Sequence, residues 1–414
     1  MFSTFHSRPH SVLKRMISNI YSKSVILSSS TIASQAKIIL HSRLLPVITA
    51  STDPCHIPLG IDVYDLWNAT TMDFITAYQF GISNSSNFLQ DAAYRQHWLE
   101  LYQSRKKYTF FPQELPKLTK FMHAIGVRLV PRWVDYANQE LEASCLRMCK
   151  AATEFSATRK SFADNPADEP VVLNALMAGI AKEQKLRGSD SVLKDTTLKE
   201  PELSIASDMI DNLGAGHETA AITMTYLTWH ISYDTALQDT LRAELLTLNP
   251  PIKYLPTITD ALPLPSPKHL DALPLLHAIV METLRVNASI PGGQPRVTPS
   301  PSCTLAGYEI PGGVRIGAAA WSLHRNAKVF PSPDTWDHTR WLDQSGQRGG
   351  RPGDEKEKSM KERDRWFWAF SSGGRMCIGS NFAMHGMFSL GVTFPFHKVL
   401  LVYVSPASPQ MSLS

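Results

Sequence analysis

Cys377 lies in a short run whose residue types could hold a reactive thiolate, Phe370-Ser-Ser-Gly-Gly-Arg-Met-Cys-Ile-Gly379. A helical run follows at 381–384, and the backbone N–H groups and dipole at a helix start favour a negatively charged sulfur. The glycines of the run let the backbone approach a flat ligand, and Arg375 offers a cation for a carboxylate. Such a thiolate binds iron or acts as a nucleophile, and a merely buried cysteine is the alternative interpretation.

Glu218 and Thr219 place an acid and a hydroxyl in the middle of a long apolar segment, 204–233, which is expected to be a buried helix. Gly214 and Gly216 stand just before them, and each glycine costs helix stability. One interpretation is a proton-handling pair. The other is a helix kink, with the threonine hydroxyl bonded back to the preceding turn.

Glu282 and Arg285 are three residues apart on an apolar helix expected over 275–286. This Glu-x-x-Arg pattern is weak by itself, because it is expected about once by chance in a chain of this length. A second copy at 362–365 lies in a charged stretch. The first copy differs from the second because its ion pair would be buried, and a buried ion pair must be fully satisfied by partners.

The cysteine run resembles the haem-binding signature of the cytochrome P450 family at all five of its fixed positions. A match of this kind arises by chance in on the order of one in ten thousand chains of this length. The resemblance implies haem as cofactor, with Cys377 as the thiolate ligand that pushes electron density onto the iron. The matching positions are Phe370, Gly373, Arg375, Cys377 and Gly379.

The resemblance also implies roles around the haem. Glu218 and Thr219 correspond to the acid–alcohol pair of the family's oxygen-activating helix, where a helix distortion makes room for O2 and the pair relays protons. Arg296 matches a frequent contact of a haem propionate. His10 and Lys14 stand where the family usually has a tryptophan and an arginine that contact a propionate.

Arg340 is the residue that the resemblance joins to the Glu282–Arg285 pair, as a structural and not a catalytic network. The family's usual Pro-Glu before this arginine is replaced by His338-Thr339, so this corner departs from the pattern. Thr219, Glu282, Arg340 and Cys377 nevertheless follow one another in the family's order, which supports the resemblance more than any single motif does.

Composition excludes several other classes of protein. The 414 residues carry a formal net charge of +4 without a clustered basic patch, so nucleic-acid binding is not expected. Five cysteines are an odd, sparse set, which argues against a disulfide framework. No apolar run reaches the roughly 18 residues of a membrane span, and residues 1–15 lack the apolar core of a secretory signal.

The expected fold is mainly α with a small β region (α+β), a single cytochrome P450 domain over 1–414 that lacks the N-terminal part of the family's fold. Short β runs are expected at 303–310 and 314–320. Residues 344–365 are predicted to be a charged surface loop. The helix after Cys377 is expected to be interrupted from Gly386, so that 386–414 forms a divergent tail.

The function implied by the resemblance is a monooxygenase that inserts one atom of O2 into a small lipophilic substrate, in secondary metabolism. Electrons would come from NADPH through NADPH–cytochrome P450 reductase. The family implies the endoplasmic reticulum membrane surface, and the lack of an anchor in this sequence leaves the cytoplasm as the alternative. Two other functions stay open: a haem-thiolate isomerase or dehydratase that needs no O2, and a non-catalytic fragment that binds haem without turnover.

Overall fold

The computed structural model describes residues 6–51, 61–159, 161–251, 264–343, 346 and 355–391. They belong to two compact units. Unit 1 comprises Met1–Ile20, Ser29–Ala50 and Asn68–His217, and unit 2 comprises Tyr21–Ser28, Ser51–Trp67 and Glu218–Ser414. The single domain predicted over 1–414 stays a prediction.

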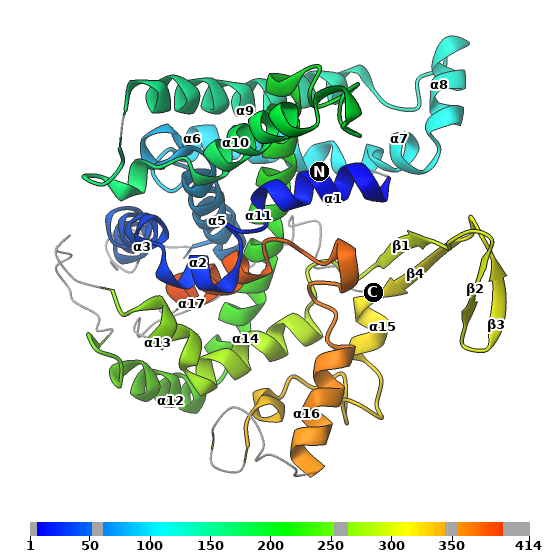
Figure 1. The fold of residues 1–414 in the computed structure, drawn as a ribbon. Coiled ribbons are helices and arrows are strands. Elements are labelled where there is room, and N and C mark those ends of the chain that lie inside the picture. The colour runs from blue at the N-terminus through cyan, green and yellow to red at the C-terminus, as the bar shows by residue number, and fades with distance from the viewer. Residues whose placement is uncertain are drawn as a thin grey trace. The chain divides into compact units, whose positions relative to one another are not determined.

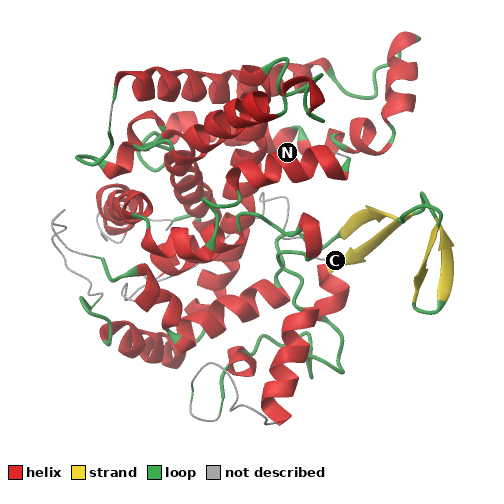
Figure 2. Ribbon diagram, viewed as in Figure 1, coloured by secondary structure: helices red, strands yellow, loops and turns green. Residues whose placement is uncertain are grey.

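Unit 1 is formed by helices joined by short turns (Figures 1 and 2). Contacts join α1 to α10, α6 to α9, and α9 to α10. Its elements are α1 (Ser7–Ile17), α3 (Ser30–Lys37), the π-helix η1 (Ile38–Leu44), α6 (Ala92–Ser104), α7 (Phe110–Glu114), α8 (Pro116–Ala124), α9 (Arg132–Thr158) and α10 (Val171–Leu186), with most of α4 (Leu45–Ser51), most of α5 (Val63–Phe80) and the first half of α11 (Pro201–Ser232).

Helix α5 is buried along its length and carries a charged residue, Asp73, that is fully shielded from solvent. The Asp73 carboxylate accepts hydrogen bonds from the Ser86 hydroxyl at 2.7 Å and from the Phe88 amide at 2.7 Å, and it pairs with Arg43 at 3.2 Å. Burial raises the pKa of Asp73, while Arg43 and these bonds act in the opposite direction. The carboxylate therefore fixes the chain that leads from α5 into α6.

Helix α11 is α-helical from Pro201 to Ser232, without a break at its glycines. Gly216 permits a close approach within unit 1, because a Cβ atom there would lie 2.6 Å from Cγ1 of Ile75 on α5. A Cβ atom at Gly214 would meet only the Tyr102 hydroxyl, at 3.5 Å. Close packing against Ile75 thus requires a glycine at position 216, whereas the space around position 214 would accept a larger residue.

Unit 2 combines helices with two antiparallel two-stranded sheets, which confirms the mainly α fold with a small β region (Figure 2). Helix α14 contacts α12, α15, α17 and the 3-10 turn η6 (His338–Trp341). The elements are α2 (Lys23–Ser28), the second half of α11, α12 (Thr235–Leu246), α13 (Pro267–Ala272), α14 (Pro274–Val286), β1 (Gly293–Val297), β2 (Ser302–Leu305), β3 (Tyr308–Pro311), β4 (Arg315–Ala319), α15 (Ala320–His324), α16 (Glu355–Trp366) and α17 (Ser380–Gly391).

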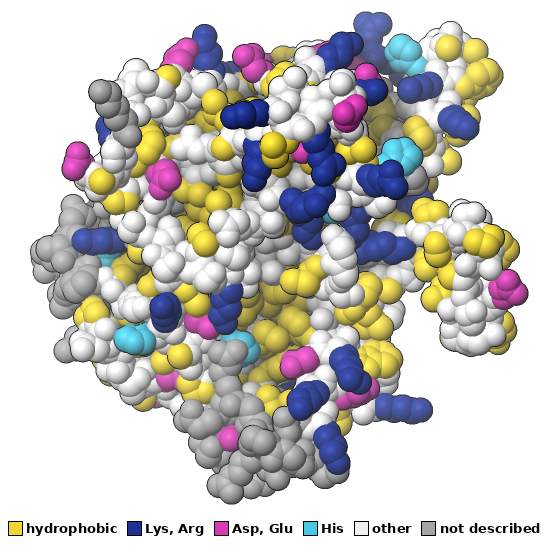
Figure 3. All heavy atoms as spheres, in the orientation of Figure 1, with side chains coloured by type: hydrophobic (Ala, Val, Ile, Leu, Met, Phe, Trp, Pro, Cys, Tyr) yellow, Lys and Arg dark blue, Asp and Glu magenta, His cyan; other side chains and the backbone are white. Residues whose placement is uncertain are grey.

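The strands pair as β1 with β4 and β2 with β3, and Arg296 on β1 stands opposite Ile316 on β4. The β2–β3 hairpin exposes apolar side chains, with Leu305 42% and Tyr308 73% accessible. Figure 3 shows this apolar surface on the hairpin. The sheet is therefore a positioning element for Arg296 and contributes little buried core.

Two expectations about the C-terminal third were wrong. Residues 355–365 of the predicted charged loop belong to helix α16, because its glutamates and lysines are strong helix formers and propensity prevails where no packing opposes it. Gly386 does not interrupt the helix after Cys377, since α17 continues to Gly391. Within α17 the side chains of 385–390 are buried, and that packing offsets the cost of one glycine. The predicted tail beyond 391 lies outside the described residues.

None of the helices built by the described residues is long and apolar enough to cross a membrane.

The two α11 glycines yield a paired prediction. Gly216→Ala should destabilise the protein by about 1–3 kcal/mol, because overpacking against Ile75 outweighs the gain in helix propensity. Gly214→Ala is the control and should be neutral or stabilising by up to about 1 kcal/mol. Urea unfolding measures both changes, and Ile75→Ala should recover part of the loss in the Gly216→Ala background. Equal stability of the two alanine variants would contradict the proposed close approach.

Candidate active site

Cys377 follows a tight turn whose backbone conformation is unusual. Ser371 and Gly373 adopt positive φ angles of 60° and 69°, and residues Gly373–Arg375 form the 3-10 turn η7. The Cys377 amide donates a hydrogen bond to the Phe370 carbonyl at 2.9 Å, which closes the loop. Cys377 is half-buried, and α17 begins at Ser380, three residues later. The cysteine thus sits at the end of a closed loop, directly before a helix, as its sequence predicts.

Two arginines flank this loop within unit 2. Arg296 donates from Nη2 to the Ser371 hydroxyl at 3.2 Å, so the strand β1 is tied to the loop. Burial and then the nearby charge of Arg296 lower the pKa of Arg375. Two cations close enough to repel each other are stabilised when an anionic group binds between them. The arrangement therefore fits a ligand that carries carboxylates.

Glu282 is fully buried on α14 and accepts five hydrogen bonds, which satisfies both of its carboxylate oxygens. Arg285 contributes two of these bonds, from Nε at 2.8 Å and from Nη2 at 2.7 Å. Such a bidentate pair has the geometry in which a buried carboxylate and guanidinium interact most strongly. The predicted ion pair at this position is therefore present and complete.

Arg285 itself is fully buried, and its remaining donors are bound by backbone carbonyls. Nη1 donates to Pro333 at 2.6 Å and to His324 at 3.0 Å, and Nη2 also donates to Thr335 at 3.0 Å. A single guanidinium thus holds the chain at three separate positions. The Cζ atom also lies 5.2 Å from the ring centre of Phe330, over its face.

Arg340 joins the pair as the resemblance implies, donating from Nε to Oε1 of Glu282 at 3.2 Å. The segment 338–341, which departs from the family pattern at His338-Thr339, still forms a 3-10 turn. The Asp337 carboxylate caps this turn by accepting a hydrogen bond from the Thr339 amide at 3.0 Å. The Asp337 amide donates to Glu282 at 2.9 Å. Replacement of the usual Pro-Glu by His338-Thr339 therefore leaves the network intact.

Trp341 belongs to the same network and was not among the residues predicted from the sequence. Its indole Nε1 donates to Oε2 of Glu282 at 2.9 Å, and the ring packs with Phe330 and Val329 in a buried cluster. The signal that could have identified it is its position directly after Arg340. Because Trp341 is 59 residues from Glu282 in sequence, no local pattern predicts the bond.

Glu218 and Thr219 are consecutive, half-buried residues of α11 and belong to the same unit as Cys377. The Thr219 carbonyl accepts a hydrogen bond from the Thr223 hydroxyl at 3.1 Å. Threonines at 223, 225 and 228 all bond back to the preceding turn, and the helix stays regular through this stretch. The role of the Glu218–Thr219 pair stays a prediction.

His10 and Lys14 lie one turn apart on α1, in unit 1. His10 is buried and Lys14 is half-buried. Their contact with a haem propionate stays a prediction. Cys145 and Cys149 lie one turn apart on α9 and are buried.

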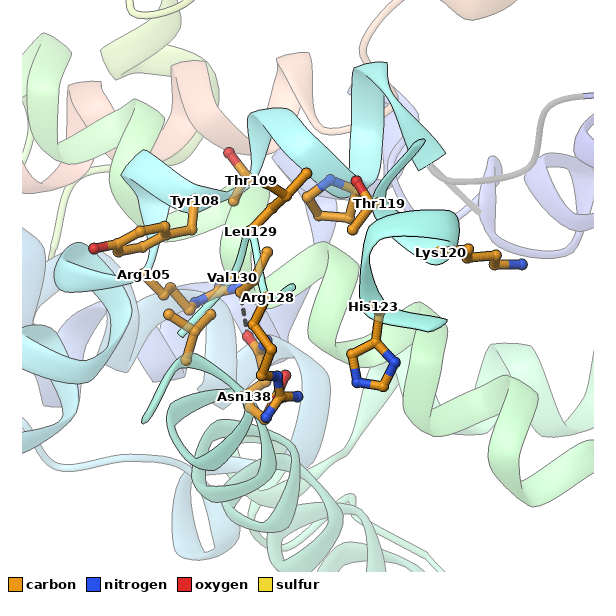
Figure 4. Close-up of a pocket in the computed structure, with 13 residues that line it drawn as sticks. Arg105, Tyr108, Thr109, Thr119, Lys120, His123, Arg128, Leu129, Val130 and Asn138 are labelled. Carbon is orange, nitrogen blue, oxygen red and sulfur yellow. Dashed lines mark hydrogen bonds and ion pairs between the residues drawn. The ribbon is translucent and has the colours of Figure 1, made fainter. Parts of the chain in front are cut away.

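A cavity of about 460 Å³ opens within unit 1, between α9 and the chain from Arg105 to Val130 (Figure 4). Arg105 donates to Asn138 at 3.1 Å, and Arg128 pairs with Asp135 at 2.8 Å. Lys120 points away from the other side chains in Figure 4. None of the site residues predicted from the sequence lines this cavity.

The chain belongs to the cytochrome P450 family, because the sequence model described as Cytochrome P450 matches residues 6–394. It is 33% identical to cytochrome P450 monooxygenase aflV of Aspergillus parasiticus over 253 residues, which are 61% of this chain and 41% of that protein. It is 24% identical to cytochrome P450 monooxygenase avaI of Aspergillus versicolor over 393 residues, covering 93% of this chain and 81% of that protein. The matched stretch thus spans less than half the length of the aflV protein.

The family implies haem, and the residues of unit 2 fit that group. A half-buried cysteine on a closed loop is an available iron ligand, and Arg296 and Arg375 together suit carboxylates. The described part of the chain contains no cluster of three or more His, Cys, Asp or Glu side chains that could hold a metal ion. Cys377 is therefore the single candidate iron ligand among the residues predicted from the sequence.

The network yields a prediction about stability. Arg285→Lys should destabilise the protein by about 3–5 kcal/mol, because a lysine cannot replace the bidentate pair and leaves Glu282 buried with fewer partners. Arg325→Lys is the matched control, since Arg325 pairs with a carboxylate, Asp334, that is 81% exposed. That change should cost less than about 1 kcal/mol. Urea unfolding measures both, and similar losses for the two variants would contradict the special role of Arg285.

Proposed function

We propose that this chain is a haem-thiolate monooxygenase with Cys377 as the iron ligand. The observation that carries the proposal is the closed loop from Phe370 to Cys377, which offers a half-buried cysteine directly before α17. When bound, haem supplies O2 binding and O–O cleavage, favoured by electron density from a thiolate. Arg296 and Arg375 would hold the propionates, and His10 and Lys14 would add to this set.

The reaction requires protons as well as electrons. One atom of O2 enters the substrate and the other leaves as water, so each turnover consumes two electrons and two protons. The Thr219 hydroxyl would donate a hydrogen bond and pass a proton towards the reacting O2, and the Glu218 carboxyl would resupply that proton. An O2-independent isomerase or dehydratase would have no use for this acid–alcohol pair, which favours the monooxygenase.

The substrate and the electron source are the finer parts of the proposal. Electrons would come from NADPH through a cytochrome P450 reductase, and the substrate would be a small lipophilic compound. Support comes from the fungal relatives, which are named cytochrome P450 monooxygenases. A role in secondary metabolism and a location at the endoplasmic reticulum membrane surface are proposed from the family resemblance alone.

The iron ligand can be tested by spectroscopy. Reduced, CO-treated protein should show the red-shifted Soret band of thiolate ligation, and Cys377→Ser should abolish it because a serine hydroxyl is not a thiolate. Cys303→Ser is the control, since Cys303 is a half-buried cysteine on β2, and it should leave the band unchanged. A wild-type band at the position of histidine-ligated haem would refute the proposal.

Proton delivery can be tested by measuring how tightly NADPH consumption is coupled to product formation. Thr219→Ala should keep the haem content. NADPH consumption should then exceed product formation, and peroxide release should rise by about tenfold because one step of the proton relay is lost. Thr223→Ala is the control, because this buried threonine lies one turn further along α11 and its hydroxyl is occupied by the Thr219 carbonyl. Unchanged coupling in the Thr219 variant would remove Thr219 from the mechanism.

A further inference from the structure

His324, the last residue of α15, is fully buried and uses both ring nitrogens. The Trp368 amide donates to Nε2 at 2.7 Å, so Nε2 carries no proton. Nδ1 lies 2.8 Å from the Arg285 carbonyl and therefore carries the proton of the neutral ring. Because a backbone N–H can only donate and a carbonyl can only accept, the two partners together fix one tautomer and exclude the charged imidazolium.

The bonds between His324 and Arg285 are reciprocal. The His324 ring donates to the Arg285 carbonyl, and the Arg285 guanidinium donates to the His324 carbonyl at 3.0 Å. The two residues are 39 positions apart in sequence, so the pair ties α15 to α14 twice. Since Arg285 is itself held by Glu282, the ring of His324 is anchored to the buried ion pair.

From His324 a series of hydrogen bonds leads to the cysteine. The Trp368 amide is bound by the ring, and the Trp368 carbonyl accepts from the Ser371 amide at 3.0 Å. Ser371 is the residue with a positive φ angle at the start of the loop that the Cys377 amide closes on Phe370. His324 thus binds Trp368, three residues before Ser371, the residue whose positive φ angle strains the backbone.

The ring is also shielded from water. Phe367 stacks on it with ring centres 5.3 Å apart and an interplanar angle of 15°, and Phe330 lies edge-on at 6.4 Å. A buried donor or acceptor that loses its partner in such surroundings costs the full desolvation of that group. Any shift of the segment at Trp368 would therefore leave the buried His324 ring without a hydrogen-bond partner, which costs free energy.

We propose that His324 is a positioning residue, whose neutral ring couples the Glu282–Arg285 pair to the backbone of the loop that presents Cys377. Loss of the ring would loosen residues 367–377 first and weaken thiolate ligation second. The second step rests on the proposed haem-thiolate function, whereas the first concerns the polypeptide alone.

Amide hydrogen exchange of the full chain, followed by mass spectrometry, tests the first step. In His324→Phe, which keeps a ring but removes both hydrogen bonds, peptides covering 367–377 should exchange roughly tenfold faster or more. His324→Gln retains one donor and one acceptor in its amide and should recover part of the protection. His230→Phe is the matched control, because His230 stacks on Trp336 and bonds Asn287, and both partners lie outside residues 367–377.

The CO spectrum of the same three variants tests the second step. His324→Phe should lose at least half of the red-shifted thiolate band, His324→Gln should keep more of it, and His230→Phe should match the wild type. Wild-type exchange in His324→Phe, or an equal effect of the His230 variant, would overturn the proposal. Absence of the band from the wild type would instead refute the proposed function, while the exchange result would still decide the role of His324.

The pH dependence of amide exchange distinguishes a hydrogen-bonding role of His324 from a purely steric one. The pKa of His324 is lowered from 6.5 to about 4, mainly by burial; the bond to the Arg285 carbonyl raises it, and the charges of Arg285 and Arg325 lower it. The unfolded chain therefore binds this proton more readily than the folded protein does. The stability that the neutral His324 ring contributes is complete above pH 6.5 and is lost as the pH falls through about 4. Relative to the intrinsic exchange rate of unprotected amides at each pH, exchange of 367–377 should rise with acid more steeply in the wild type than in His324→Gln, and parallel profiles would overturn the assignment.

Discussion

The buried ion pair of Glu282 and Arg285 is the constraint on which the rest of unit 2 depends. Removing two charges from water costs several kcal/mol for each ion, and this cost is offset only when every donor and acceptor has a partner. The pair meets that condition by binding Arg340, Trp341 and backbone groups from His324 to Asp337. The conformation of that stretch follows from the need to satisfy two buried charges.

The same constraint extends to the candidate active site. His324 connects the Arg285 carbonyl to the Trp368 amide, and the loop that follows carries the half-buried Cys377. Arg296 approaches this loop from the β1–β4 sheet through the Ser371 hydroxyl. A rigid helix, a short sheet and one loop thus fix the surroundings of the cysteine, which is the condition for holding a ligand in a defined geometry.

The sequence predicts those features that depend on local order. The turn-and-helix context of Cys377, the helices predicted over 204–233 and 275–286, and the Glu282–Arg285–Arg340 network are all present. The sequence-based prediction fails at α16, where the helix propensity of a charged segment was underestimated, and at Gly386 in α17, where packing offsets the cost of a glycine. Trp341 and His324 were not predicted, because their bonds join residues 39 to 59 positions apart and a single sequence carries no signal for such pairs.

The central claim is that the network presents Cys377 as an iron ligand. X-ray absorption at the iron edge of the purified, haem-loaded protein measures this most directly, because sulfur and nitrogen ligands scatter differently. The account predicts one sulfur neighbour of the iron in the wild type and none in Cys377→Ser. A wild-type spectrum explained by nitrogen and oxygen neighbours alone would contradict it.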